Sequence, residues 1–427
     1  MMRMITATLV LGLLATGAAA HDFYVAPASD AQSKTMDGSV KHPFTSVQEA
    51  VRSDLVSGGD RIILRKGEYG TIKIVHARFD TAIEIISETQ GAAHADQIIV
   101  QGSQGLYFKG ISVWPRKSRT KPRHLVHAGA DATNIRFDAM DIRGNVDAPA
   151  RYMNWSKAEW LEDGRTSGVR LDGANNAITN SRLTGVAFGI TTSGDRAVVR
   201  GNRIEGFSGD AMRGLGNGSV FEGNKVENCF KVDKNHDDGF QSWATKKGEN
   251  GRKTISDMVI ENNIILEWTG PASHPLHCTL QGIGLFDGIY KNFTIRNNLI
   301  AVSAYHGIAL YGGTDSRIVN NTVVNISGAA VAYPWIMLSD HKNGWKGRDL
   351  LVTNNVAMAY KGIKAAAQHN AVSRYLTTLF RDPEKFDFRL MLGSPLVDAG
   401  TMEGAPEHDI LGTARTGHPD LGAFELQ

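Results

Sequence analysis

The 427-residue sequence predicts an all-β fold, a single-stranded parallel β-helix that carries an N-terminal capping helix and inserted loops. A six-residue, strand-like word recurs along the chain, apolar at its first and sixth positions and usually asparagine at its fourth. Successive copies begin 21, 22, 39, 35, 23 and 34 residues apart, so a short period is stretched at intervals by insertions. Forty-six glycines against 12 prolines, with few long apolar helical patterns, also indicate a turn-rich β protein.

The recurring word has a simple physical basis. One coil cannot bury its own apolar face, so coils must stack and bring like residues together. The copies are ITNSRL (178–183), VRGNRI (199–204), FEGNKV (221–226), IENNII (260–265), IRNNLI (295–300), IVNNTV (318–323) and VTNNVA (352–357). The predicted polar column consists of Asn202, Asn224, Asn263, Asn298, Asn321 and Asn355. Stacked asparagines can hydrogen-bond along the column, and asparagine tolerates the left-handed geometry of a tight corner.

The domain organisation follows from the repeat. Length alone suggests two or three domains, but a solenoid grows without splitting, so residues 21–427 are expected to form one domain. Residues 1–20 have the pattern of a secretory signal peptide: Arg3, an apolar run and a small-residue site at 18–20. We therefore expect a secreted or periplasmic monomer without a membrane anchor. A net charge of +2 gives no general attraction to nucleic acid.

A short amphipathic helix is expected near residue 50. Thr45 and Gln48 resemble a capping box, and one apolar face is formed by Val47, Ala50, Val51 and Leu55. Such a helix would cover the open end of the solenoid. Cys229 and Cys278 are compatible with one disulfide or with two buried thiols, and both alternatives stay open.

Both ends of the chain resemble a known class. FYVAP, HPFTSVQEAV and RIILRKGEY near the N-terminus resemble the opening of many secreted right-handed β-helix proteins. FDFRLMLGSPLVDAG (386–400) and HPDLGAFE (418–425) resemble the C-terminal segment of that class. The resemblance implies a right-handed coil, as does the general handedness of parallel crossovers.

Long loops are expected to project from the solenoid and to form the walls of a groove. One is basic, with Arg116, Lys117, Arg119, Lys121 and Arg123. Another contains Tyr152, Trp155 and Trp160, and further loops follow Trp243, Leu266 and Trp335. A basic loop is often only a solvated surface, but beside an aromatic groove it suits a polyanionic sugar.

A second word, with a central Gly or Ala, precedes most asparagine words. Stacking would place its equivalent positions about 4.8 Å apart. Two positions after the centre, the expected outward column is Arg170, Thr191, Arg213, Gln241, Gly284, Ala309 and Ala332. The column just before the centre is Ser167, Phe188, Asp210, Asp238, Gln281, His306 and Ala329. Trp243, Phe286 and Tyr311 would form an aromatic column over three coils, suited to stacking on sugar rings or to packing beneath loops.

The polar residues of these columns, with His236, Asp237 and Lys234, form the candidate site, and the alternative is a solvated surface of Asp–Arg pairs. Arg213, or Arg170, could pair with a sugar carboxylate. His236, then His306, then Lys234 are the candidate bases. Asp238 and Gln241 would orient the sugar or a metal, and Asp210 and Gln281 complete the binding surface. Asp210, Asp237 and Asp238 are candidate Ca²⁺ ligands, although no calcium loop of defined spacing is present.

The cluster resembles the pectate-lyase-like superfamily, which includes alginate and chondroitin lyases. That resemblance implies β-elimination on an acidic, uronate-containing polysaccharide. His236-Asp237 is similar to the end of the Asp-Pro-His-Asp element of mannuronan C5-epimerases, but Lys234-Asn235 replaces Asp-Pro. Asp237-Asp238 is similar to the acidic pair of polygalacturonases, whose Gly-His-Gly and Arg-x-Lys elements are missing. We rank lyase first, hydrolase second and epimerase third. A non-catalytic glycan-binding surface protein remains a fourth alternative.

Overall fold

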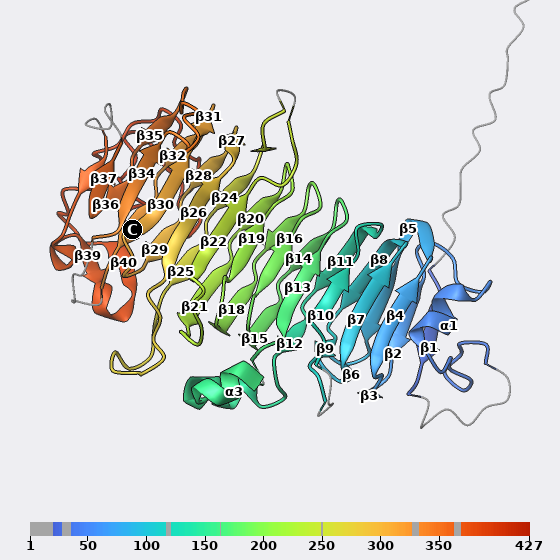
Figure 1. Cartoon of the computed structure of the whole chain (residues 1–427). Coiled ribbons are helices and arrows are strands. Elements are labelled where there is room, and N and C mark those ends of the chain that lie inside the picture. Colours follow the sequence, from blue (N-terminus) through green and yellow to red (C-terminus); the bar gives the residue numbers. More distant parts are fainter. Residues whose placement is uncertain are drawn as a thin grey trace, which may run out of the picture.

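The computed structural model describes residues 20–27, 36–116, 121–162, 164–248, 251–326, 333–362 and 369–427. Its strands stack in parallel along one axis and form the elongated solenoid of Figure 1. The chain passes through three long sheets, named C, A and B in the order in which each coil contributes a strand to them, before it steps to the next coil. The parallel β-helix that the repeat predicts is therefore confirmed.

Three long sheets make up the walls. Sheet A comprises β1 (Asp22–Val25), β2 (Arg61–Leu64), β5 (Arg78–Ser87), β8 (Gln104–Lys109), β11 (Thr133–Asp138), β14 (Ala177–Thr179), β17 (Val198–Arg200), β20 (Val220–Glu222), β24 (Val259–Glu261), β28 (Thr294–Arg296), β32 (Arg317–Val319) and β35 (Leu351–Thr353). Sheet B comprises β3 (Gly67–Glu68), β6 (Ala93–Ala95), β9 (Ser112–Val113), β12 (Asp141–Arg143), β15 (Arg182–Val186), β18 (Arg203–Phe207), β21 (Lys225–Cys229), β25 (Ile264–Leu266), β29 (Leu299–Ala301), β33 (Thr322–Val324), β36 (Val356–Ala357) and β38 (Ala371–Val372). Sheet C comprises β4 (Thr71–Val75), β7 (Gln97–Gln101), β10 (His124–Ala128), β13 (Ser167–Leu171), β16 (Ile190–Thr192), β19 (Met212–Gly214), β22 (Asp238–Trp243), β26 (Gln281–Asp287), β30 (His306–Tyr311), β34 (Trp335–Ser339) and β37 (Ala359–Lys361).

Smaller strands and helices lie outside the three long sheets. A short parallel sheet contains β23 (Thr254–Ser256), β27 (Ile289–Lys291) and β31 (Gly313–Thr314), and an antiparallel pair contains β39 (Phe380–Asp382) and β40 (Asp387–Leu390). The α-helices are α1 (Val47–Arg52), α2 (Ala148–Arg151) and α3 (Lys157–Glu162), and the 3₁₀ helices are η1 (Tyr152–Asn154), η2 (Leu376–Thr378) and η3 (Pro383–Lys385). Among the described residues, none of the helices has the length and apolar character needed to cross a membrane.

Apolar columns fill the interior of the solenoid. The first and sixth residues of the recurring word, such as Ile178 and Leu183, are buried as predicted, except that Val352 in the last copy is only partly buried. On sheet C the inward column that includes Met212, Phe240 and Ile283 is also fully buried. Removing these side chains from water supplies about 25 cal/mol per Å² of apolar surface, so the stacked coils stabilise one another.

The predicted asparagine column forms a continuous ladder at the corner between sheets A and B. Asn224, for example, donates from its backbone N and its Nδ2 to Oδ1 of Asn263, at 3.0 and 2.9 Å. Its Nδ2 also donates to the Val199 carbonyl at 2.9 Å. The left-handed conformation belongs to the preceding residue, as in Asn262 (φ 56°) and Gly223 (φ 64°), and not to the ladder asparagine as we expected. The Asn-Asn dipeptide therefore combines a left-handed corner with a ladder rung.

The capping helix α1 is confirmed, with a shifted cap. Ser46 is its N-cap and accepts from the Glu49 backbone N at 3.1 Å, while Thr45 donates to the Glu49 carboxylate. The predicted Thr45/Gln48 box is wrong because Gln48 instead accepts from Val75 N on β4. Leu55 is exposed and lies beyond the helix, which ends at Arg52.

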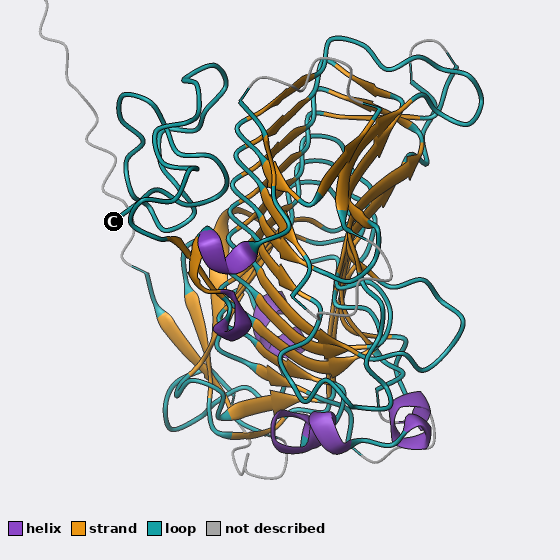
Figure 2. Ribbon diagram, turned by 90° about the vertical axis from the view of Figure 1, so that its left-hand side faces the viewer, coloured by secondary structure: helices purple, strands orange, loops and turns teal. Residues whose placement is uncertain are grey.

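The aromatic loop after β12 forms a second apolar cluster outside the coils, and Figures 1 and 2 show its helix α3 projecting beside the strands. The cluster contains Tyr152, Trp155, Trp160, Phe230, Val232 and Trp268. Cys229 and Cys278 form a disulfide beside it, which resolves the alternative left open by the sequence. This cluster and disulfide anchor the segment between β21 and β22, where the candidate site begins.

Candidate functional site

The outer face of sheet C carries the predicted outward column. Register pairs His127 with Arg170, Arg170 with Thr191, Thr191 with Arg213, and Arg213 with Gln241. The column continues through Gly284 and Ala309, as the second word predicts. Ala329 and Ala332 lie outside the described residues. The strand that pairs with β30 is β34, so the next position is Met337 instead of Ala332.

An ion pair holds the centre of the site. Arg213 Nε donates to Oδ2 of Asp210 at 2.6 Å, and the Asp238 backbone N donates to the other oxygen of Asp210 at 3.1 Å. The guanidinium lies 3.7 Å from the centre of the Phe188 ring and 5.6 Å from that of Trp243. Burial raises the pKa of Asp210, although the positive charge of Arg213 acts in the opposite direction. Arg213 is thus fixed in place by a carboxylate and two aromatic faces.

The adjacent coil supplies an Asp–His pair. Oδ2 of Asp238 lies 3.0 Å from Nδ1 of His236, whose side chain is 63% exposed. The hydrogen bond to Asp238 raises the pKa of His236, while burial raises the pKa of Asp238 to about 6. Because Nδ1 faces the carboxylate, the other ring nitrogen, Nε2, is directed away from it and is available for proton transfer.

Two buried oxygen atoms at this site have no hydrogen-bond partner among the described residues. They are Oδ1 of Asp238 and Oε1 of Gln281, on directly paired positions of β22 and β26. A Cβ added at Gly284 would lie 2.7 Å from that same Asp238 oxygen, so the carboxylate extends over Gly284 on the outer face. Buried acceptors without donors are costly unless a ligand or water satisfies them. The pair is suited to bind sugar hydroxyl groups.

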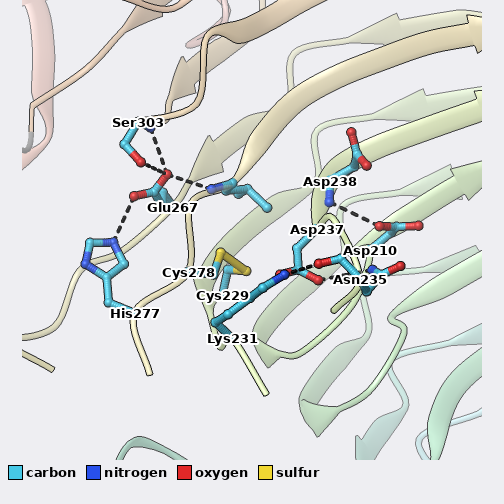
Figure 3. Close-up of a disulfide and its surroundings, with 11 residues drawn as sticks. Asp210, Cys229, Lys231, Asn235, Asp237, Asp238, Glu267, His277, Cys278 and Ser303 are labelled. Atoms are coloured by element: carbon cyan, nitrogen blue, oxygen red, sulfur yellow. Dashed lines mark hydrogen bonds and ion pairs between the residues drawn. A yellow bond between two sulfur atoms is a disulfide. The ribbon is translucent and has the colours of Figure 1, made fainter. Parts of the chain in front are cut away.

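Asp237 faces away from the other two carboxylates. Figure 3 shows its side chain directed toward Lys231 and Asn235, beside the Cys229–Cys278 disulfide, while the Asp238 carboxylate points to the opposite side. Burial raises the pKa of Asp237 to about 6. Adjacent residues of an extended segment project to opposite faces, which explains why the Asp-Asp dipeptide does not act as one pair. Asp237 was expected on the same face as Asp210 and Asp238, but its carboxylate instead contacts Lys231 and Asn235.

The residues do not fit the Ca²⁺ site considered from the sequence. In the described part of the chain, the one group of three potential ligands within 4.8 Å of each other is Cys229, Asp237 and Cys278, whose sulfur atoms are joined in a disulfide. Asp210, Asp237 and Asp238 do not form such a group, and Arg213 already neutralises Asp210. We therefore assign no chemistry here to a metal ion.

His306 is held as a neutral, buried ring. Trp335 Nε1 donates to its Nδ1 at 3.2 Å, and Phe286, Tyr305 and Trp335 lie around it with ring centres 4.3–5.5 Å away. Burial lowers the pKa of His306 to about 4. Since Nδ1 accepts a hydrogen bond, Nε2 carries the proton, so His306 can donate to a ligand but is poorly suited to be the base.

The aromatic residues form a platform, though not the single column expected. Phe286 and Tyr311 meet edge to face at 5.3 Å, but a β-bulge after Ser242 shifts Trp243 opposite Asp287. Trp243 and Phe286 instead line one cavity of about 620 Å³ with Gln241, His341 and Trp345. Trp345 lies in a loop without strand periodicity, so no register could be used to place it near the site from the sequence.

Two further candidates lie apart from this centre. Arg170 pairs with Asp172 at 2.9 Å and lies two strands away from Arg213. Lys234 is exposed on the loop that precedes His236. The central site therefore contains Asp210, Arg213, His236, Asp238, Gln241 and Gln281, flanked by His306 and the aromatic platform.

Comparisons with known proteins confirm the fold and its hand. Residues 160–333 match the family model of the right-handed beta helix region. The chain is similar to the crystal structure of pectate lyase Pel9A, with TM-score 0.53 and 20% identity over 95% of this chain and 96% of that chain. It also resembles an alginate lyase from Paenibacillus sp. str. FPU-7 (TM-score 0.40, 15% identity, 78% and 97% covered). A third similar structure is the GH136 lacto-N-biosidase from Eubacterium ramulus (0.45, 12%, 80% and 67%). Among curated proteins none matches.

Proposed function

We propose that this right-handed β-helix protein is an exported polysaccharide lyase that cleaves an acidic, uronate-containing polysaccharide by β-elimination. The observation that carries the proposal is the Asp238–His236 pair, which lies next to the Asp210-anchored Arg213 on the outer face of sheet C. Export is supported by the signal-like residues 1–20 and by the Cys229–Cys278 disulfide, which is typical of an oxidising compartment.

Arg213 is the group that would bind the uronate carboxylate. Its Nε is used by Asp210, and a guanidinium has further N–H donors that match a carboxylate in bidentate geometry. Pairing withdraws charge from the carboxylate and makes the C5 proton of the sugar more acidic. The aromatic faces of Phe188 and Trp243 keep the guanidinium in position and partly screen it from water.

His236 would then remove the C5 proton through Nε2. The C5–H electron pair forms the double bond between C4 and C5, and the C4–O4 bond breaks with its electrons on the departing oxygen. That oxygen takes a proton from water, and His236 returns its proton to solvent. Asp238 keeps Nδ1 protonated and stabilises the imidazolium that forms, as an orienting carboxylate does in a catalytic triad.

The buried acceptors and the aromatic platform would hold the sugar. Asp238 Oδ1 and Gln281 Oε1 can accept hydroxyl protons from the ring in the site. Trp243 and Phe286, which line the neighbouring cavity, offer faces for the adjoining ring. These contacts place the reacting C–H near His236 by proximity and orientation.

A glycoside hydrolase is the second candidate, favoured by the raised pKa of Asp238. A carboxyl that holds its proton to a pH of about 6 suits a general acid. Its partner would have to be Asp210, since Asp237 faces Lys231 and the disulfide. Asp210 is already paired with Arg213, which lowers its value as a second catalytic carboxylate. The lyase therefore ranks first.

The test is a panel of polyuronates incubated with the mature protein, with ultraviolet absorbance and new reducing ends followed together. Absorbance and reducing ends that rise in parallel, and that are lost in His236→Ala, support elimination. Reducing ends without absorbance would establish hydrolysis. Exchange of the C5 hydrogen with deuterated solvent, without cleavage, would indicate epimerisation. Binding without any of the three would leave a glycan-binding protein.

A further inference from the structure

A second charged cluster lies on the outer face of sheet C, N-terminal to the proposed site. Residues of β7, β10 and β13 and the chain beside them line a cavity of about 390 Å³. Its lining residues are Gln97, Arg123, His124, His127, Arg170 and Asp172. Two arginines and two histidines line the cavity against one carboxylate, so it favours an anion.

Asp172 organises this cluster. Its Oδ2 accepts from Arg170 Nε at 2.9 Å and lies 3.0 Å from His127 Nε2, while Ser193 donates to Oδ1. Burial acts to raise the pKa of Asp172, but the hydrogen bonds from His127, Arg170 and Ser193 outweigh it and hold the pKa well below its usual value. Asp172 therefore remains a carboxylate and fixes the direction of the Arg170 and His127 side chains, as a supporting residue does beneath a binding site.

His124 adds a buried polar atom to this cavity. Its Nδ1 is buried and has no hydrogen-bond partner among the described residues. The ring lies 5.6 Å from that of His127, and burial, with the nearby cations, lowers the pKa of His124 to about 4. A simple structural Arg–Asp pair would need neither this imidazole nor Arg123.

The cluster is continuous with the proposed site. Arg123 also lines a larger cavity of about 1360 Å³, whose other lining residues include Ser167 and Phe188. The Phe188 ring is the one on which the Arg213 guanidinium lies. Arg170 and Arg213 occupy the same outward column with Thr191 between them, a separation of about 10 Å for two strand spacings.

We propose that Arg170, His127 and Arg123 form a second anion subsite, which binds the acidic group, carboxylate or sulfate ester, of another sugar residue of the same chain. The inference rests on the proposed function for its polysaccharide, but it concerns binding alone. It makes Arg213 and Arg170 two fixed cationic points on one surface. A substrate must therefore be long enough, and charged at suitable intervals, to reach both.

The test measures binding to the full-length His236→Ala protein, so that cleavage does not interfere. Isothermal titration with uronate oligomers of increasing length should show a step in affinity once the oligomer reaches both subsites. Arg170→Gln and Arg123→Gln should each weaken binding of the long oligomer roughly tenfold and leave the shortest oligomer that binds unchanged. Arg136→Gln, an exposed arginine on sheet A, is the matched control and should change neither.

The outcomes separate this inference from the proposed function. A length step that disappears in Arg170→Gln supports the subsite even if the protein cleaves nothing. Equal affinity for all lengths, or equal losses for short and long oligomers in Arg170→Gln, would overturn the subsite even if the protein is a lyase. A parallel titration with sulfated and uronate oligomers of equal length identifies which acidic group is bound.

Discussion

Asparagine side chains stack along the corner between sheets A and B, whereas charged side chains stack on the outer face of sheet C. In the ladder each amide repeats the bonds of its neighbour, so donors and acceptors are matched from rung to rung. On sheet C the side chains differ from coil to coil, and Asp238 and Gln281 each keep one buried oxygen atom without a partner in the described part of the chain. Repetition satisfies polar groups within the protein, while variation leaves polar groups that a ligand or water must satisfy.

The largest expected effect is on turnover and concerns the charged residues on the outer face of sheet C. His236→Ala should lower turnover roughly 10²–10⁴-fold, because it removes the group that transfers the proton. Unfolding in denaturant should change little, since the His236 side chain is mostly exposed. His418→Ala, at another exposed histidine, is the control and should keep full activity. Activity retained in His236→Ala would remove His236 from the mechanism.

The next effect is on stability and concerns the asparagine ladder. Asn263→Ala should reduce the free energy of unfolding by about 3 kcal/mol, because Asn224 loses the acceptor for two buried donors and the Phe221 carbonyl loses its donor. Urea unfolding measures the change. Asn262→Gly, which keeps the left-handed corner, should shift stability far less. Equal losses in the two variants would show that the corner geometry, and not the ladder, stabilises the coil.

A smaller effect on the free energy of unfolding is expected at Asp238, because a buried carboxylate in the candidate site should lower the stability of the folded protein. The folded-state pKa of Asp238, about 6, lies above its usual value, so the folded protein binds this proton more tightly than the unfolded chain. Its contribution to stability is greatest below about pH 4 and declines as pH rises to about 6. Asp238→Asn should remove this decline and stabilise the protein at neutral pH by about 2 kcal/mol while impairing catalysis. Urea unfolding at several pH values would contradict this if the variant and the original declined in parallel.

The smallest effect concerns the space around Asp238. Gly284→Ala would place a Cβ 2.7 Å from Asp238 Oδ1 and 2.6 Å from the Phe286 ring, so the carboxylate and its histidine must shift. We expect turnover to fall about tenfold, with little change in unfolding. Ala309→Ser on the next coil of the same column is a control that alters the surface beyond the pair. Unchanged turnover in Gly284→Ala would show that the position of Asp238 is not critical.

The pH profile sharpens the assignment of roles. The pKa of His236 is raised, and a base must be neutral to accept a proton, so turnover should rise with pH as His236 loses its proton. A hydrolase that depends on protonated Asp238 should instead lose turnover as pH rises above about 6. Initial rates measured across this range therefore distinguish the two mechanisms.

The parts of the molecule that repeat could be predicted from the sequence. The coils, the buried columns and the asparagine ladder all follow because each coil must bury the same face against the next, which forces the pattern to recur. The outward column from Arg170 to Ala309 was predicted for the same reason, as strand parity fixes the direction of each side chain.

The positions of side chains that do not follow the repeat were decided by the tertiary structure. Asp237 and Asp238 are neighbours in sequence, but extended backbone turns one toward Lys231 and the other toward His236. A β-bulge moves Trp243 out of its expected register, and the strand that follows β30 is β34, not the expected strand around Ala332. The sequence determined the stack because periodic burial is a local property of the chain. Which polar atoms meet on its surface depends on loops, bulges and burial, and only the folded coils bring these together.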